Sequence, residues 1–356
     1  MIGCDKFVTQ QGLTAPGCLG YTSDAMVGFC TSPLYIRHDP GLHHPERPIR
    51  LQAILAAVRE AGLVLSPNPL PYEGLDFGFV SRAREPLLEL TPRPATIEEV
   101  CLVHPLRHVQ RVLQRSQTGG LLDEGDTPVG LGSYEAAMLA VGGVLTCCDA
   151  VIRGQVSRAF AAIRPPGHHA LANSSSGFCL FSNIAIAARY LQHVHGLEKI
   201  AIVDFDVHHG NGTQAIFEAD PSILFVSLHQ NPHCHYPGSG FKWEIGVGRG
   251  KGLTLNIPMR DRAGDKEYLQ AMDNQVIPAV ERFRPEAILV SAGFDAHKDD
   301  PLGDMRVTED GYAAMTRRLV ELANQHCAGR LISALEGGYN LIALGRSVVA
   351  HLEAMQ

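Results

Sequence analysis

The stretch KIAIVDFDVHHGNG, residues 199–212, decides how this chain folds. Its first half, Lys199–Phe205, is a short run of apolar and β-branched residues, which is typical of a strand buried on both faces of a parallel sheet. The run leads directly into Asp206 and His208. Because ligands bind just beyond the carboxyl ends of parallel strands, the stretch predicts a buried strand with functional side chains at its end.

Helix-like and strand-like segments alternate around this strand from about residue 134 onward. The further expected strands are Ser157–Ile163, Ser222–Leu228, Ala287–Ser291 and Arg330–Leu335. The expected helices are Tyr134–Ile152, Phe181–Leu191, Tyr268–Phe283 and Gly311–Gln325. Such alternation indicates βαβ units, so we expect a three-layer α/β/α fold around a mainly parallel sheet, with the active site at the carboxyl ends of the strands.

Composition narrows the classes of protein that remain. The 356 residues are 45% hydrophobic and carry a net charge of −7, without a block of Lys or Arg, which argues against nucleic acid and anionic lipid as partners. We find no uncharged apolar stretch that would span a membrane and no secretory signal, so we expect no membrane partner and a cytoplasmic location. The nine cysteines form no CxxC pair and are expected to be reduced.

No internal repeat or low-complexity linker divides the sequence. We therefore expect a single domain over residues 1–356, with residues 1–34 as an N-terminal extension of unknown role. The oligomeric state stays open, a homo-oligomer included.

Reactive side chains follow several of the expected strands. Because strand geometry has a period of two, Asp204, Asp206 and His208 can face one point, and Asp295 follows the strand Ala287–Ser291 at the same edge of the sheet. Two carboxylates and one imidazole, with room for water, are typical of an open catalytic metal site, whereas closed structural sites favour thiolates.

Two further strand ends add groups that can transfer protons or donate hydrogen bonds. The strand Ser157–Ile163 leads into Arg164-Pro165-Pro166-Gly167-His168-His169, where the prolines would hold two adjacent imidazoles in a rigid turn. The strand Arg330–Leu335 leads into EGGYN, where paired glycines permit a tight turn that aims Tyr339 inward. Four strand ends are therefore expected to converge.

These motifs resemble the zinc-dependent histone deacetylase family, including its bacterial amidohydrolase members. The resemblance extends from about residue 35 to residue 350, in the family's order. It rests on HDPGLHHPERPIRL (38–51), RPPGHHA (164–170), GFCLFSN (177–183), DFDVHHGNGTQ (204–214), SLHQ (227–230), YPGSG (236–240), SAGFDAHKDDPLG (291–303) and EGGYN (336–340). It implies an arginase/deacetylase-like fold and one zinc ion per chain.

The resemblance also implies roles for individual residues. The zinc ligands fall on Asp206, His208 and Asp295, and the catalytic histidines on His168 and His169. Asp204 resembles the partner of His168. Asn211 resembles the partner of His169 and is an amide, as in class II members. Tyr339 resembles the tyrosine that stabilises the transition state, which points to a competent deacetylase.

Substrate and potassium sites are implied in the same way. Phe178 and Tyr236 resemble the walls of an acyl-lysine tunnel, and Gly177 would accept a hydrogen bond from the substrate amide. Asp126 resembles the residue that binds the substrate backbone, and Arg50 an arginine lining a channel behind the zinc. The potassium ligands fall on Asp204, Asp206, His208, Ser227 and Leu228. A second monovalent-cation site near Phe217 is expected, without readable ligands.

We expect removal of acetyl or other acyl groups from lysine in proteins or peptides. The polyamine-deacetylating branch of the family places a glutamate where this chain has Leu302, and an uncharged side chain there fits acyl-lysine better. Acetylpolyamine hydrolysis remains an alternative, as does a catalytically silent acyl-lysine-binding protein, against which the intact site argues. An arginase-type dimanganese site would need ligands for a second metal, which the sequence does not offer.

Other conspicuous residues are expected to play lesser parts. His233, Cys234 and His235 precede YPGSG, so they are expected at the tunnel rim, contacting substrate or solvent and not a second metal. Trp243 is expected to pack beneath that rim. The helical histidines are expected to be surface or hydrogen-bonded residues; they are His193, His195, His326 and His351.

Overall fold

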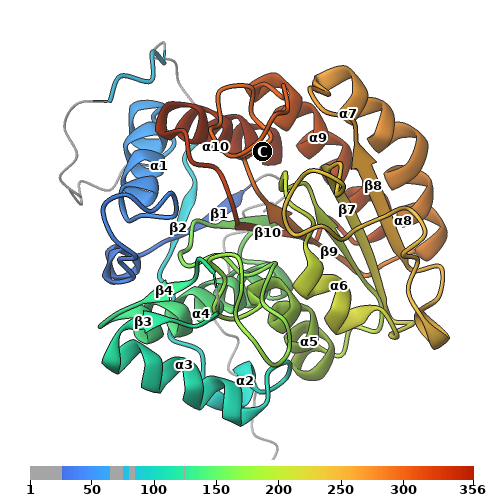
Figure 1. The fold of residues 1–356 in the computed structure, drawn as a ribbon. Coiled ribbons are helices and arrows are strands. Elements are labelled where there is room, and N and C mark those ends of the chain that lie inside the picture. The colour runs from blue at the N-terminus through green and yellow to red at the C-terminus, as the bar shows by residue number, and fades with distance from the viewer. Residues whose placement is uncertain (1–25, 65–74, 80–84, 124) are drawn as a thin grey trace, which may run out of the picture.

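A parallel sheet of eight strands forms the centre of the molecule (Figure 1). The structure, a computed structural model, describes residues 26–64, 75–79, 85–123 and 125–356. The strands run in the order β2-β1-β5-β10-β9-β6-β7-β8, and every neighbouring pair is parallel. Their bounds are β1 Val27–Cys30, β2 Leu88–Leu90, β5 Arg158–Ala161, β6 Ile200–Asp204, β7 Ile223–Gln230, β8 Thr254–Met259, β9 Ala287–Ala292 and β10 Leu331–Leu335. A separate antiparallel pair joins β3 (Gly120–Leu121) to β4 (Pro128–Val129).

Helices cover both faces of the sheet, as the alternating pattern predicted. One layer holds α1 (Ile49–Glu60), α7 (Asp265–Ala271), α8 (Ile277–Phe283), α9 (Glu309–His326) and α10 (Leu341–Met355). The other holds α2 (Ile97–Val100), α3 (Leu106–Thr118), α4 (Ser133–Ile152), α5 (Asn183–His195) and α6 (Asn211–Phe217). Two 3-10 turns, η1 (Pro33–Arg37) and η2 (Gly248–Gly250), lie in the connections. The expected three-layer α/β/α architecture is confirmed.

All five strands expected from the sequence are present, with ends that differ by a few residues. The helix expected over Tyr268–Phe283 is divided by a π-helical turn, η3, at Met272–Val276. The sequence reasoning did not predict β1, β2 or β8. Each is an outer strand or a short one whose composition gives no clear period, so it is recognisable only through its partners in the sheet.

The N-terminal boundary needs correction. Part of the extension expected over residues 1–34 is β1, which pairs with β2 on one side and β5 on the other. Val27 and Phe29 on this strand are buried in the core. These residues therefore belong to the central sheet, while residues 1–25 lie outside the described part of the chain.

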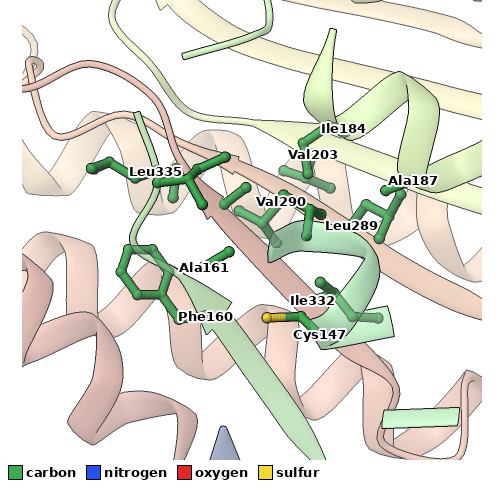
Figure 2. Packing of buried hydrophobic residues seen from close by; sticks show 14 of the residues in the cluster. Cys147, Phe160, Ala161, Ile184, Ala187, Val203, Leu289, Val290, Ile332 and Leu335 are labelled. Atoms are coloured by element: carbon green, nitrogen blue, oxygen red, sulfur yellow. The ribbon is translucent and has the colours of Figure 1, made fainter. Parts of the chain in front are cut away.

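One continuous core of apolar side chains lies on both faces of the sheet (Figure 2). Phe160, Val203 and Leu289 project from three central strands and are fully buried. Cys147 of α4 and Ile184 of α5 pack in the same cluster. A fully buried side chain of this size stabilises the fold by about 1.5–3 kcal/mol, so this core holds the strand ends in fixed positions.

Helix α4 is long and apolar enough to cross a membrane by length and composition alone. It is the only such helix among the described residues, and 78% of its most apolar window is buried inside the fold. It packs against β1, β5 and β10. Burial against the sheet therefore accounts for its composition.

The order of the strands brings the four expected strand ends together. β5, β10, β9 and β6 are consecutive in the sheet. Their carboxyl ends lead into the loops that carry His168, Tyr339, Asp295 and Asp206, respectively. Segments more than a hundred residues apart in sequence thus meet at one edge of the sheet.

Candidate active site

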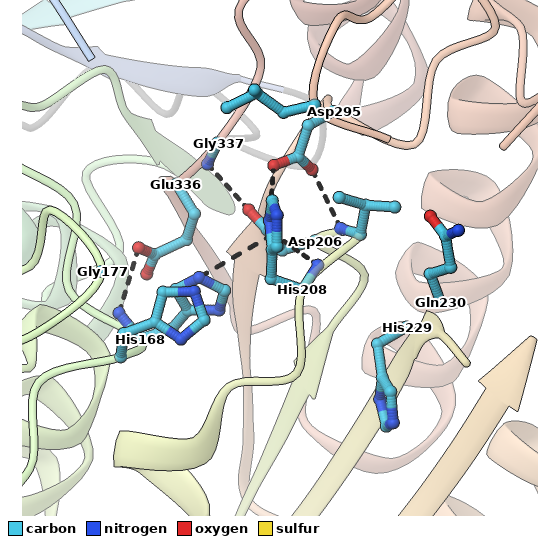
Figure 3. Close-up of polar contacts among 12 residues, drawn as sticks. His168, Gly177, Asp206, His208, His229, Gln230, Asp295, Glu336 and Gly337 are labelled. Atoms are coloured by element: carbon cyan, nitrogen blue, oxygen red, sulfur yellow. Dashed lines mark hydrogen bonds and ion pairs between the residues drawn. The ribbon is translucent and has the colours of Figure 1, made fainter. Parts of the chain in front are cut away.

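Three side chains converge at the ends of β6 and β9 (Figure 3). One ligand atom each from Asp206, His208 and Asp295 lies within 4.8 Å of the others. The His208 Nδ1 atom is 3.1 Å from Asp206 Oδ1 and 3.2 Å from Asp295 Oδ2. Both carboxylates are fully buried. The structure therefore brings together the three residues that the strand pattern predicted to share a metal.

The donors of this cluster fit a divalent metal ion. Asp295 Oδ2 is buried and accepts no well-aligned hydrogen bond, although His208 Nδ1 lies 3.2 Å away, so this oxygen is available to bind another group. Two buried carboxylates this close also repel each other unless a cation lies between them. One imidazole and two carboxylates leave coordination positions for water or substrate, as catalytic zinc sites do. The cluster is compatible with a metal site, and no other group of this kind occurs in the described residues.

Two glycines make room for the ligands. A Cβ atom added to Gly293 would lie 2.0 Å from Asp206 Oδ2, and one added to Gly337 would lie 2.0 Å from Asp295 Oδ2. Such distances are far shorter than any real contact. The Gly337 N–H also donates a 2.8 Å hydrogen bond to Asp206 Oδ2. Glycine is therefore required at both positions for the carboxylates to occupy the cluster.

The two adjacent imidazoles have different partners. His168 Nδ1 lies 2.9 Å from Asp204 Oδ2, and its Nε2 lies 3.8 Å from Asp206 Oδ1. His169 Nδ1 lies 2.7 Å from Asn211 Oδ1. An amide oxygen only accepts, so His169 Nδ1 carries the proton and its Nε2 is left free to accept one. The partners expected from the sequence are both present.

These environments separate the pKa values of the two rings. Burial lowers the pKa of His168, but the charges of Asp204 and Asp206 outweigh it and place that pKa well above its usual value. Burial also lowers the pKa of His169, and the neighbouring His168 and His208 lower it further. His169 is thereby favoured as a neutral base beside a charged His168. Oppositely tuned pairs of this kind are typical of acid–base catalysis.

A buried ionic cluster fixes the loop that carries both imidazoles. Arg164 binds Glu46 through two hydrogen bonds, at 2.6 and 2.8 Å, and Arg50 donates a third to the same carboxylate at 3.0 Å. Burial raises the pKa of Glu46, but Arg164, His38 and Arg50 outweigh it, so that pKa lies well below its usual range. The loop is therefore attached to the 38–51 segment by a bidentate charged pair.

A second buried carboxylate, Glu336, holds the same loop from the β10 side. Its Oε2 accepts hydrogen bonds from the backbone N–H groups of Gly167, at 2.6 Å, and His168, at 3.1 Å (Figure 3). Sequence reasoning assigned Glu336 no role, although it lies in the EGGYN motif. Its function depends on hydrogen bonds to backbone N–H groups that precede it by more than 160 positions in the sequence. No local sequence pattern reveals such contacts.

Arg50, expected to line a channel behind the zinc, lies behind Tyr339, and the channel itself stays a prediction. It is fully buried and does not line the active-site cavity. Its guanidinium donates 2.6 Å hydrogen bonds to the carbonyls of Gly338 and Glu336 and lies 4.8 Å from the centre of the Tyr339 ring. Its Nε and Nη2 groups hold the loop that carries Tyr339 and its Nη1 group binds Glu46, so the contact of Arg50 with the site passes through the Tyr339 ring.

Tyr339 projects into the cavity from the turn after β10. Gly338, with φ of +115°, forms that turn. The Tyr339 ring meets Phe178 edge to face at 6.1 Å. Burial raises the pKa of Tyr339 well above its usual value, although Arg50 lowers it. The phenol therefore keeps its proton and is a hydrogen-bond donor.

A cavity of about 310 Å³ joins these groups. It is lined by the expected residues Asp126, His168, His169, Gly177, Phe178, His208, Tyr236, Leu302 and Tyr339, and also by Pro166, His235 and Gly337. Phe178 and Tyr236 supply aromatic walls and Leu302 an apolar one. Burial and the nearby Asp123 raise the pKa of Asp126. An apolar cavity with few polar groups at its base suits a ligand with an alkyl stem.

The rim residues differ in part from expectation. His235 lines the cavity and stacks on the imidazole of His208 at 4.8 Å, and its contact with substrate stays a prediction. Trp243 was expected to pack beneath the rim, and this is wrong: it is 70% exposed and stacks on Phe241 at 4.4 Å. Its indole finds an aromatic partner on the surface. Among the helical histidines, His351 is buried and bonded to Thr316 and Ser333.

The residues expected to bind potassium lie around the end of β6. Strand register places Asp204 opposite Ser227 of the neighbouring β7, and Leu228 follows Ser227 on that strand. Asp204 Oδ1 accepts a hydrogen bond from the Asp206 N–H at 3.1 Å. These residues therefore lie close together at the end of β6, and the binding of a potassium ion by them stays a prediction.

An open Asp-His-Asp cluster beside two oppositely tuned imidazoles, at the base of a narrow cavity, defines the type of site found in metal-dependent hydrolases. A model of the histone deacetylase domain matches residues 44–355. The chain belongs to the histone deacetylase family and is a hydrolase of the deacetylase and amidohydrolase type.

Individual relatives agree with this assignment. A probable deacetylase of Archaeoglobus fulgidus is 40% identical over 307 residues, which cover 86% of this chain and 79% of that protein. A histone deacetylase-like amidohydrolase of Pseudomonas aeruginosa is 44% identical over 247 residues, which cover 69% of this chain and 65% of that protein. The crystal structure of the HDA15 HD domain superposes with a TM-score of 0.83 at 36% identity, covering 93% of this chain and 88% of the other.

Proposed function

We propose that this protein is a zinc-dependent amidohydrolase that removes acetyl or other acyl groups from the ε-amine of lysine in proteins or peptides. The observation that carries the proposal is the shared cavity: the neutral His169, the protonated Tyr339 and His208 all line it, and His208 forms one cluster with the buried Asp206 and Asp295. The products would be the free acid, acetate for an acetyl group, and a lysine amine.

Zinc held by Asp206, His208 and Asp295 would polarise the acyl carbonyl and lower the pKa of bound water. His169 Nε2 accepts the proton of the attacking water, because its Nδ1 proton is committed to Asn211. The same atom then delivers that proton to the lysine amine as the amide bond breaks. His168, charged by Asp204, stabilises negative charge nearby.

Tyr339 supplies the remaining interaction with the substrate. Its hydroxyl forms no hydrogen bond with any residue in the part of the chain that the structure describes. It is therefore free to donate to the carbonyl oxygen as negative charge develops on it. Phe178 and Tyr236 enclose the alkyl stem and exclude water from it.

Lysine is favoured over polyamine because the rim position occupied by Leu302 is uncharged. A cationic polyamine would gain from a carboxylate at this place, whereas a lysine stem gains from an apolar contact. A cytoplasmic location and a structural potassium ion bound by Asp204, Asp206, His208, Ser227 and Leu228 are parts of the same proposal.

The test compares kcat/KM for an acetyl-lysine peptide and for N-acetylputrescine, each with zinc-loaded, chelator-treated and zinc-restored protein. Zinc-dependent turnover that is faster on the peptide supports the proposal. Faster turnover of N-acetylputrescine would reassign the enzyme to polyamines. No turnover of either substrate by zinc-loaded protein would indicate an acyl-lysine-binding protein instead.

A further inference from the structure

Asp300 is a buried carboxylate that the proposed chemistry does not use. It lies in the loop after β9, is 7% exposed, and has no Lys or Arg partner among the ion pairs of the described residues. Removing a carboxylate from water without a counter-ion is costly. Its retention at the edge of the active site therefore requires another explanation.

Backbone N–H groups satisfy this carboxylate on both sides. Asp300 Oδ2 accepts hydrogen bonds from the N–H groups of Tyr339, at 2.6 Å, and Asn340, at 3.1 Å. Asp300 Oδ1 accepts one from the N–H of Leu302, at 3.0 Å. Burial and the nearby Asp295 raise the pKa of Asp300 to about 7, and these three N–H donors oppose that rise because they stabilise the carboxylate.

The two oxygens thus hold residues that line different parts of the cavity. Tyr339 lies beside the metal-site cluster, and Leu302 lines the cavity from the loop after β9. These residues are 37 positions apart in sequence, and no hydrogen bond joins them directly in the described structure. Asp300 is the group through which their backbones are connected.

We propose that Asp300 is a positioning residue that sets the Tyr339 phenol against the substrate carbonyl with one carboxylate oxygen and fixes the Leu302 rim with the other. This inference rests on the proposed function. It predicts that the two oxygens serve different kinetic quantities. The Oδ2 side governs kcat through the phenol, and the Oδ1 side governs KM through the rim.

Hydrogen bonds hold the turn that carries Tyr339 on both sides of that residue. Gly338 is in the positive-φ region, at +115°, and a Cβ atom there would lie 2.9 Å from Leu344 Cδ1. Arg50 holds the preceding carbonyl, that of Gly338, at 2.6 Å. Asp300 holds the N–H groups on the other side of that turn. Asp300 accepts the hydrogen bond of the Tyr339 N–H itself, so its loss lets the ring shift, and displacements of about 1 Å at a reacting group can cost about a hundredfold in rate.

The experiment measures kcat and KM on an acetyl-lysine peptide for Asp300→Ala, in wild-type and Tyr339→Phe backgrounds. We expect Asp300→Ala to lower kcat about tenfold to a hundredfold in the wild-type background. In the Tyr339→Phe background, where the hydroxyl is absent, the same change should lower kcat only about twofold. An equal loss in both backgrounds, or no loss in either, would overturn the proposal.

Asp300→Asn separates the two oxygens. Its single amide oxygen is expected to face the side with two donors, so Tyr339 and Asn340 keep their acceptor and Leu302 loses its own. We expect kcat within about threefold of wild type, with a several-fold higher KM. If Asp300→Ala does not fold, Asp300→Asn alone tests the role of Asp300. An unchanged KM, or a fall in kcat as large as the rise in KM, would contradict the inference.

Asp299→Ala is the matched control. Its carboxylate is one residue away, 61% exposed, and should be replaceable without effect on kcat or KM. Zinc content and the unfolding midpoint are measured for every variant. A wild-type protein inactive on all acyl-lysine substrates would refute the proposed function, whereas active wild type with an unaffected Asp300→Ala refutes only the role of Asp300.

Discussion

The two ends of the central sheet each hold a cavity, and only one holds a reactive cluster. The cavity at the carboxyl ends has a volume of about 310 Å³, and its lining includes four histidines, two tyrosines and an aspartate. The cavity at the amino ends is larger, about 520 Å³, and lies between the α4–β5 and α9–β10 turns. None of its lining residues is a histidine, a cysteine or a carboxylate.

The larger cavity has a structural explanation. Arg158 at the start of β5 donates hydrogen bonds to the carbonyl of Met355, at 2.9 Å, and to Asn324 Oδ1, at 2.7 Å. It thereby ties the sheet to the carboxyl-terminal ends of α9 and α10, where helix dipoles favour a cation. The active site is therefore distinguished from the larger cavity by its converging titratable groups and not by its volume. We expect substitutions at the two ends of the sheet to affect different properties, activity at the carboxyl ends and stability at the amino ends.

Replacing a metal ligand should have the largest effect. Asp295→Asn removes one of two anionic ligands, so zinc content should fall below one per chain and kcat/KM by about a thousandfold or more. Arg330→Gln, which alters the cavity at the amino ends, should leave both quantities unchanged. Metal analysis and peptide kinetics on both variants check this, and a comparable loss in Arg330→Gln would break the comparison.

Tyr339→Phe should lose turnover without losing metal. The variant removes a single donor to the developing negative charge, for which a loss of about 10²–10³ in kcat is expected. Zinc content and the unfolding midpoint should match wild type. Activity like that of wild type in this variant would refute the assignment of Tyr339.

Leu302→Glu should change selectivity more than rate. A carboxylate at the rim attracts a cationic polyamine and disfavours the apolar contact with a lysine stem, so the ratio of N-acetylputrescine to peptide kcat/KM should rise about tenfold. Leu302→Gln, similar in size but neutral, is the control. An identical ratio in the two variants would show that charge at this position does not select the substrate.

Arg158→Leu should destabilise the fold and spare the chemistry. It leaves the Met355 carbonyl and Asn324 without their donor, which should lower the free energy of unfolding by about 1–3 kcal/mol. kcat should stay at the wild-type level below the unfolding transition. Urea denaturation and peptide kinetics measure the two effects, and a loss of kcat in folded protein would assign the amino end a catalytic role.

The smallest effect concerns pH and a buried histidine far from the metal cluster. Burial lowers the pKa of His351 to about 3, from 6.5 in an unfolded chain. Protonation therefore favours the unfolded state, and His351 costs about 1 kcal/mol of stability between pH 6.5 and pH 5.5. His351→Gln should reduce the loss of unfolding free energy over this interval by that amount. A loss as steep as in wild type would contradict the assigned pKa.

The sequence predicted the reactive end of the sheet better than the rest of the fold. Asp206, His208 and Asp295 follow strongly apolar strands, so local pattern and sheet topology together located them. The α/β/α layers followed from the same alternation. β1 and β8 were missed, because a short strand and an edge strand with a proline carry weak periodicity.

Interactions between distant backbone groups were not predictable in this way. Arg50 was expected to line a channel behind the zinc, but its hydrogen bonds to the carbonyls of Glu336 and Gly338, more than 280 residues away in sequence, were not predicted. Glu336 and Asp300 likewise act on backbone N–H groups, which carry no sequence signature. Trp243 was misplaced because hydrophobicity alone does not show that an aromatic side chain stacks on the surface.

The most direct test of the central claim is release of acetate from an acetyl-lysine peptide by the metal-free protein, with zinc added back in steps. The account predicts no release without metal, release that rises to a plateau at one zinc per chain, and no release at any zinc level by Asp295→Asn. Full turnover by metal-free protein, or a plateau that requires two metals per chain, would contradict it.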